Sequence, residues 1–201
     1  VEDNSGIYQE TNAINVTAQN NPFVFPVEHS YAINGTINTL GLATEPISQT
    51  QIGQYPLYIF TDKGIYALEQ GSGAVLYSNL ILINTDTCNN DICQTRNGVA
   101  YIANGNVYIL AGRNNLNISL PLRGPIDMDI RQSSSYQLAC MGQLYDISKY
   151  LSQVPIEEFL KNAMLSYIAS TGDLIVSNPD YPYSYIFSFA YKNWHKSTQT
   201  F

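Results

Sequence analysis

The stretch that decides the fold is YIFTDKGIYAL, residues 58–68. It consists of an apolar strand end, a turn centred on Gly64, and then an aliphatic residue beside an aromatic one. Gly64 gives the turn the backbone freedom that positive φ angles demand, so the stretch predicts a β-hairpin. Four further stretches repeat the pattern, with either an aromatic or a second aliphatic residue as the partner of the aliphatic one: YAINGTI (31–37), YIANGNVYIL (101–110), LACMGQLYDI (138–147) and YIASTGDLIV (167–176). Each of the five is expected to form a hairpin.

The spacing of these hairpins indicates an architecture. Asn34-Gly35 and Asn104-Gly105 suit a two-residue type I′ turn, which requires positive φ at both central positions. The longest interval, from Ile65 to Val107, falls near the roughly 40 to 50 residues of a four-stranded propeller blade, and the other intervals are shorter. The sequence therefore predicts an all-β fold, a β-propeller-like array of antiparallel hairpins or blades. A plain meander or a sandwich is the alternative.

Composition agrees with β structure and limits the function classes. The 201 residues include 16 Tyr, and only 12% are charged, which favours half-buried pleated surfaces. The formal net charge is −7, and the 9 Lys and Arg are scattered, so direct sequence-specific nucleic-acid binding is not expected. No apolar run approaches the roughly 18 residues that a membrane-spanning helix needs. We therefore expect no membrane span.

The chain is expected to form a single all-β propeller-like domain over residues 1–201, with residues 1–20 as a possible arm or edge strand. One short connecting helix is predicted near residues 155–164. Pro155 suits its first turn, Glu157 and Glu158 favour its N-terminus, and Phe159, Leu160 and Met164 supply an apolar stripe.

The candidate interaction surface is a run of alternating aromatic residues near the C-terminus. Side chains alternate along a strand, so one face would carry Tyr181, Tyr183, Tyr185, Phe187 and Phe189, with Trp194 nearby. Such a stripe could stack sugar rings. The favoured interpretation is that it packs between neighbouring blades or protomers, because each ring buries a large apolar area.

Residues that could carry chemistry are few, and we predict no enzyme activity, metal or cofactor. Cys88, Cys93 and Cys140 are an odd set whose C-x4-C spacing has no second ligand pair for zinc. His29 and His195 are the only imidazoles, and neither lies in a nucleophile motif. Three acidic pairs are candidates for glycoside hydrolysis, but a turn, a helix start and an Asn-rich connection explain them better: Asp127 with Asp129, Glu157 with Glu158, and Asp86 with Asp91.

Three stretches in the same order carry a family resemblance. They are Asn21–Pro26, Gln51–Leu68, and Leu174–Pro179 followed by Tyr183, Tyr185 and Trp194. With them the chain resembles the tail muzzle or nozzle proteins of crAss-like short-tailed gut phages and their prophage relatives, although Ile52 stands where an aromatic residue is expected. These motifs are structural and say nothing of chemistry.

The resemblance implies a function and its setting. The chain would be a virion structural protein, a propeller-like subunit acting by assembly and by passage or gating of DNA. Its partners would be copies of itself and other tail proteins, in the virion tail and, during assembly, in the host cytoplasm. Because such proteins are longer, the chain would be a fragment or a reduced member. The alternative is a carbohydrate- or protein-binding β-propeller module of a gut bacterium, with a glycan as its possible ligand.

Overall fold

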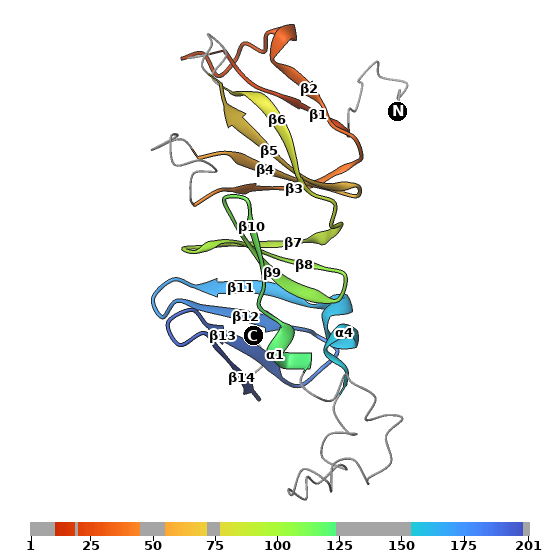
Figure 1. The fold of residues 1–201 in the computed structure, drawn as a ribbon, viewed down its shortest axis with the longest axis vertical. Helices are drawn as coiled ribbons and strands as arrows, with labels where there is room; N and C mark the ends of the chain where they lie inside the picture. Colours follow the sequence, from red (N-terminus) through yellow and green to blue (C-terminus); the bar gives the residue numbers. More distant parts are fainter. Residues whose placement is uncertain (1–10, 19, 45–54, 72–76, 124–153, 199–201) are drawn as a thin grey trace, which may run out of the picture. The chain divides into compact units, whose positions relative to one another are not determined.

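The computed structural model describes residues 11–18, 20–44, 55–71, 77–123 and 154–198. Within them the chain is built mainly from antiparallel strands, and the predicted all-β class is confirmed (Figure 1). The short helices there are η1 (Val27–His29), α1 (Leu120–Arg123), α4 (Ile156–Phe159) and η2 (Leu160–Asn162). Among those residues, no helix has the length and apolar character that crossing a bilayer requires.

The strands of the described residues form one two-stranded and three four-stranded sheets. The N-terminal pair is β1 (Ala13–Asn15) and β2 (Ser30–Ala32). The first sheet holds β3 (Ile37–Leu42), β4 (Leu57–Thr61), β5 (Gly64–Gln70) and β6 (Tyr77–Asn84). The second holds β7 (Cys88–Thr95), β8 (Gly98–Ala103), β9 (Asn106–Ala111) and β10 (Asn114–Asn117). The third holds β11 (Met164–Ile168), β12 (Asp173–Ser177), β13 (Ser184–Ser188) and β14 (Asn193–Ser197).

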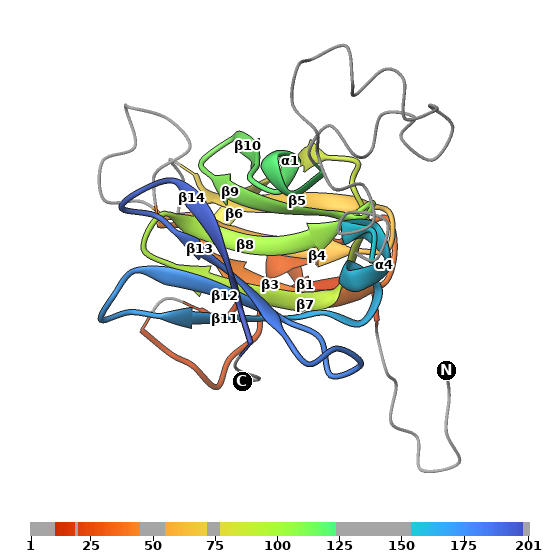
Figure 2. The same cartoon turned by 90° about the horizontal axis from the view of Figure 1, so that it is seen from below.

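In each four-stranded sheet the strands lie in chain order, so each sheet is a simple meander (Figures 1 and 2). Three predicted hairpins are confirmed. Residues 58–68 form β4 and β5, residues 101–110 lie in β8 and β9, and residues 167–176 lie in β11 and β12. Asn104 and Gly105 have φ angles of 51° and 67°, as the type I′ turn demands. Residues 138–147 lie outside the described part of the chain.

The predicted hairpin at residues 31–37 is wrong. β2 pairs with β1, and β3 pairs with β4, so Asn34-Gly35 connects two different sheets. The backbone amides of Ile33 and Ile37 donate instead to carbonyl oxygens of residues 12 and 11. Gly35 has a positive φ of 110°, but it lies in a connection between two sheets and not in the turn of a hairpin.

The turns at Thr61 and Thr95 use the same chemistry. Each Thr hydroxyl donates to the carbonyl oxygen of the Gly three residues later, at 2.8 Å to Gly64 and 2.7 Å to Gly98. Each hydroxyl also accepts from the backbone amide two residues on, at 3.1 Å. Gly64 and Gly98 both have positive φ, and a Cβ on either would lie within 2.6 Å of a carbonyl oxygen. The tight turn therefore requires glycine.

The predicted helix near residues 155–164 is present but short. α4 begins after Pro155, which is extended, and Glu157 and Glu158 lie in its first turn. The 3-10 helix η2 continues it to Asn162. Met164 does not belong to the helical stripe, because it opens strand β11.

The first sheet buries side chains on both of its faces. Tyr58, Ile59 and Phe60 are consecutive in β4 and all fully buried, although their side chains point alternately to opposite faces. On one face, Ile59 packs with Ile33 and Leu68, and residues of the N-terminal pair complete the cluster. Residues 1–20 thus contribute a strand, β1, to a packed layer.

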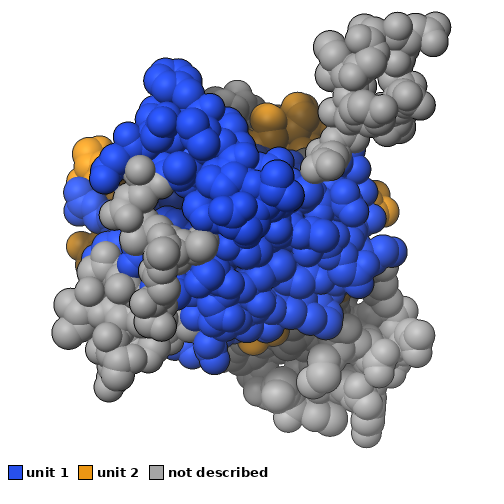
Figure 3. Space-filling model, turned by 90° about the horizontal axis from the view of Figure 1, so that it is seen from above, with its two compact units in different colours: residues 1–104, 109–116 blue, residues 105–108, 117–201 orange. Residues whose placement is uncertain are grey.

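Contacts between Cα atoms divide the chain into two compact units, coloured separately in Figure 3. Unit 1 comprises residues 1–104 and 109–116, and unit 2 comprises residues 105–108 and 117–201. The boundary passes through β9. The single domain over residues 1–201 stays a prediction.

Candidate functional site

The aromatic residues singled out in the sequence surround Phe159 in unit 2. Phe159 ends α4 and is fully buried. The ring centroid of Tyr181 lies 5.3 Å from that of Phe159, the ring of Tyr183 is stacked on it at 5.2 Å, and the ring of Tyr185 meets it edge-on at 4.9 Å. Stacked and edge-to-face pairs at these distances are the favoured geometries of aromatic rings. We call these four residues the Phe159 cluster.

The other predicted residues form a second aromatic group. Phe187 contacts Phe189 at 5.2 Å and Trp194 at 5.1 Å, and Trp194 is its cross-strand partner in β14. Tyr167 of β11 meets Phe189 edge-on at 6.1 Å. The indole nitrogen of Trp194 donates to the carbonyl oxygen of Ile118 at 2.7 Å, which fixes the ring within unit 2.

The strand that carries these residues is shorter than predicted. β13 covers only Ser184–Ser188, so Tyr181 and Tyr183 precede it. The backbone amide of Tyr181 donates to the carbonyl oxygen of Asn178 at 3.1 Å, because the chain turns there. Successive rings still touch, since the centroids of Tyr181 and Tyr183, and of Tyr183 and Tyr185, are both 5.7 Å apart. One continuous strand with five aromatic residues on one face is therefore wrong.

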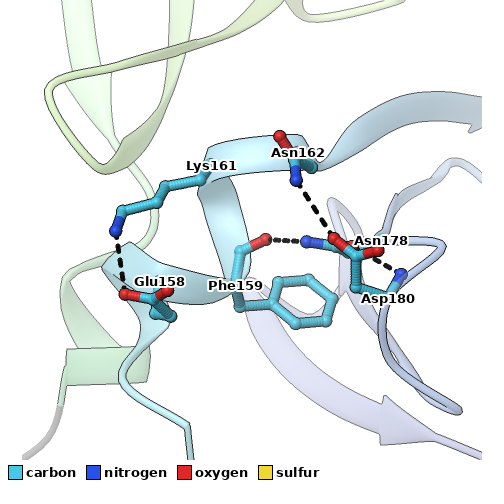
Figure 4. A network of polar contacts seen from close by, with 6 residues as sticks. All are labelled: Glu158, Phe159, Lys161, Asn162, Asn178 and Asp180. Atoms are coloured by element: carbon cyan, nitrogen blue, oxygen red, sulfur yellow. Dashed lines mark hydrogen bonds and ion pairs between the residues drawn. The ribbon is translucent and has the colours of Figure 1, made fainter.

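A polar network holds the turn against α4 and η2 (Figure 4). The side-chain amide of Asn178, which is buried, donates to the carbonyl oxygen of Phe159 at 2.6 Å. Its Oδ1 accepts from the backbone amide of Asp180 at 2.8 Å, and Asn162 donates to the Asp180 carboxylate at 3.0 Å. Asn178 thus satisfies a carbonyl at the end of a short helix. Sequence reasoning missed it, although the Asn178-Pro179-Asp180 turn was a signal.

The electrostatics of the Phe159 cluster favour neutral phenols. Burial raises the pKa of Tyr185 to about 12, and repulsion from Tyr183 adds to the effect. Burial likewise raises the pKa of Tyr183. The ammonium nitrogen of Lys196 lies 3.7 Å from the centroid of the Tyr183 ring, a cation–π contact. Tyr183 is therefore stacked on Phe159 and contacted by a cation within its own unit.

The acidic and sulfur candidates that lie in the described part of the chain have structural contacts. Asp86 accepts hydrogen bonds from the side-chain amides of three asparagines at 2.7, 3.0 and 3.3 Å: Asn84, Asn104 and Asn115. Glu158 pairs with Lys161 at 2.9 Å on an exposed surface.

Burial raises the pKa of Cys88 to about 12 and also raises that of Cys93, so both thiols are protonated at neutral pH. Asp127, Asp129 and Cys140 lie outside the described residues. In the described part of the chain, no three His, Cys, Asp or Glu side chains gather in a way that could hold a metal ion.

A second arrangement of interest lies in unit 1, where the first and second sheets pack together. The side chains of Tyr58 and Phe60 point away from the N-terminal pair. Phe60 of β4 contacts Tyr101 of β8, with ring centroids 5.5 Å apart. The Tyr58 hydroxyl donates to the carbonyl oxygen of Gly112 at 2.8 Å. The second strand of the first sheet therefore contacts the second strand of the second sheet through one pair of rings, and Tyr58 reaches the turn between β9 and β10.

The first strands of these two sheets also meet. The side-chain amide of Gln94 in β7 donates to the carbonyl oxygen of Leu42 in β3 at 2.7 Å and accepts from its backbone amide at 3.2 Å. Asn38 of β3 donates to the carbonyl oxygen of Cys88 in β7 at 3.2 Å. A Cβ on Gly41 would lie 3.2 Å from side-chain atoms of both sheets, so the strands approach closely there. The repeated hairpin motif in the sequence did not reveal that the first strands of the two sheets lie side by side.

Comparisons with protein-family models, with characterised proteins and with solved structures found no match.

Proposed function

We propose that this chain is a structural subunit whose four-stranded sheets act as blades of a β-propeller-like array, and that it works by assembly and not by catalysis. One observation carries the proposal: between the first and second sheets, β3 lies along β7, and Phe60 of β4 contacts Tyr101 of β8. Radial repetition of a four-stranded unit places equivalent strands of neighbouring blades against each other. A sandwich of unrelated sheets has no reason to place the first strand of one sheet along the first strand of the next.

The setting that we propose is the tail of a short-tailed gut phage or a prophage relative. The resemblance at residues 51–68 supports a muzzle or nozzle subunit, which would assemble with its own copies and with other tail proteins around the DNA exit path. The composition suits this role. A surface with few charges and many Asn, Gln and Tyr can pack closely against neighbours without desolvating ions.

The proposal is tested on particles and on the protein. Particles purified from a culture that carries the gene should contain the chain by mass spectrometry, and immunogold labelling should place it at the tail. Native mass spectrometry of the chain at increasing concentration should detect homo-oligomers. A chain that is absent from particles and monomeric at every concentration would overturn the proposal.

A glycan array separates assembly from ligand binding. A sugar-binding module would use Tyr183 and Tyr185 as a platform, but Phe159 and Lys196 already contact Tyr183. On a glycan array the wild-type chain should give no signal above a denatured control. A signal that Tyr183→Ala abolishes would favour the carbohydrate-binding alternative instead.

A further inference from the structure

The loop between β1 and β2 displays apolar side chains to solvent. Phe23 is 89% exposed and Val27 is 90% exposed, and Val24 and Phe25 between them are also exposed. We call residues 21–28 the apolar loop. Scattered single apolar residues are normal on a surface, but four large ones within five positions form a patch, and such patches mark interaction sites.

The apolar loop is held in shape by its backbone. The Ala18 amide donates to the Val24 carbonyl oxygen at 2.8 Å, and the Asn21 amide donates to the Ala18 carbonyl oxygen at 3.1 Å. The Asn21 side chain accepts from the Phe23 amide at 3.2 Å, and the His29 amide donates to the Pro26 carbonyl oxygen at 2.9 Å. A loop ordered in this way loses little conformational entropy when a partner covers it.

Charge indicates what kind of surface covers the apolar loop. Residues 1–62 contain no Lys or Arg, and Glu28 in the loop is exposed. An anionic membrane would repel this part of the chain. A symmetric contact between two apolar loops would bring Glu28 of one copy towards Glu28 of the other. A partner surface that complements the exposed apolar side chains and Glu28 is therefore apolar and basic.

The chain itself carries such a surface in the β13–β14 hairpin. Residues 181–201 contain no Asp or Glu and include Lys192, His195 and Lys196. At the tip of the hairpin, Tyr191 is 80% exposed and Lys192 is also exposed. An exposed aromatic ring beside a cation complements an apolar loop that carries a carboxylate.

We propose that the apolar loop of one copy docks on the tip of the β13–β14 hairpin of a second copy, with Phe23 and Val27 against Tyr191 and Glu28 beside Lys192. Because two different surfaces meet, the contact is head-to-tail, and repetition gives a ring or an open filament. This inference rests on the proposed assembly function and names the surfaces that carry it.

Sedimentation equilibrium of the 201-residue chain tests the apolar half of the contact. The double variant Phe23→Ser, Val27→Ser should raise the dissociation constant for self-association at least about tenfold, because two exposed apolar side chains no longer become buried. Leu116→Ser is the matched control, since Leu116 is 62% exposed on β10, and it should leave association unchanged. Unchanged association in the loop variant would overturn this contact and leave the assembly function standing. A wild-type chain that never associates would overturn both.

A charge exchange and a crosslink test the partner surface. Glu28→Lys and Lys192→Glu should each weaken association, and the double exchange should restore it. Separately, p-benzoylphenylalanine in place of Phe23 should crosslink to residues 189–198 of an isotope-labelled second copy. Absence of rescue, or crosslinks only to other parts of the second copy, would overturn the proposed contact.

Discussion

Gln94 forms both hydrogen bonds of a β-ladder with Leu42, although Gln94 supplies them with its side chain. Leu42 lies in β3, an edge strand whose outer backbone groups have no further strand of the first sheet to pair with. The Gln94 side-chain amide supplies, for Leu42, the two hydrogen bonds that a further strand would supply. At Leu42 the edge is thereby covered by a residue from the neighbouring sheet, and a covered edge is protected from pairing with other chains.

Gln94→Ala should lower the free energy of unfolding by about 1 kcal/mol, because both bonds lie at an exposed site where water replaces them. Gln94→Glu should cost as much or more. Its carboxylate can accept from the Leu42 amide, but it cannot donate to the Leu42 carbonyl oxygen and would repel it. Urea denaturation of both variants checks this, and a Gln94→Glu protein as stable as the wild type would contradict the two-bond pairing.

Asn178→Ala should cost more, about 1 to 3 kcal/mol, because the bond to the Phe159 carbonyl oxygen is buried and no water can replace it. Asn178→Asp is the sharper variant. It keeps an acceptor for the Asp180 amide but loses the donor to Phe159, so it should also destabilise. Asn162→Ala, at an exposed position of the same network, should change stability by no more than about 0.5 kcal/mol. Equal effects at Asn178 and Asn162 would show that the network has no buried centre.

Gly98 and Gly172 offer a matched pair for the turn chemistry. A Cβ on Gly98 would lie 2.3 Å from the carbonyl oxygen of Leu110 at a φ of 137°. On Gly172, at a φ of 74°, the nearest atom would be the Tyr167 hydroxyl at 3.9 Å. Gly172→Ala should therefore cost only the left-handed strain of about 1 to 2 kcal/mol. Gly98→Ala should exceed about 3 kcal/mol because a backbone clash adds to the strain. Thermal unfolding measures both, and the reverse order would contradict the turn geometry.

The sequence predicted what local chemistry determines. The glycine turns at 58–68, 101–110 and 167–176 form hairpins because each turn and its strands are neighbours in the chain. The stretch at 31–37 has the same local signal, but its backbone amides find partners at residues 11 and 12, which no local rule identifies. The prediction failed there because non-local pairing overrode turn propensity.

The candidate site likewise has one part that the local sequence predicted and another that only tertiary contacts reveal. Alternating aromatic residues marked Tyr181 to Phe189, and all of them have ring contacts. Phe159, which three of the rings surround, lies on another element, so only the tertiary structure reveals its role. The hydrogen bonds that join β3 to β7 come from the side chains of Asn38 and Gln94. Nothing in the sequence distinguishes these two polar residues from others on the surface.

Alkaline pH should weaken the Phe159 cluster through Tyr185. Its pKa is raised from 10.0 to about 12 in the folded chain, chiefly by burial. The phenol of the unfolded chain therefore ionises first, so the unfolded state binds fewer protons than the folded state between pH 10 and 12. The stabilising contribution is fully present below pH 10 and is lost as the pH rises through that window.

The free energy of unfolding, measured by urea denaturation at steps between pH 9 and 12, checks this window. The wild-type curve should fall, and Tyr185→Phe should fall less steeply, because it keeps the ring against Phe159 without a titratable group. Cys88, whose pKa is raised by burial from 9.0 to about 12, gives a loss of the same sign in both proteins and cancels in their difference. Parallel curves would mean that Tyr185 ionises as easily in the folded chain as in the unfolded one. The ring would then not be buried against Phe159 in solution.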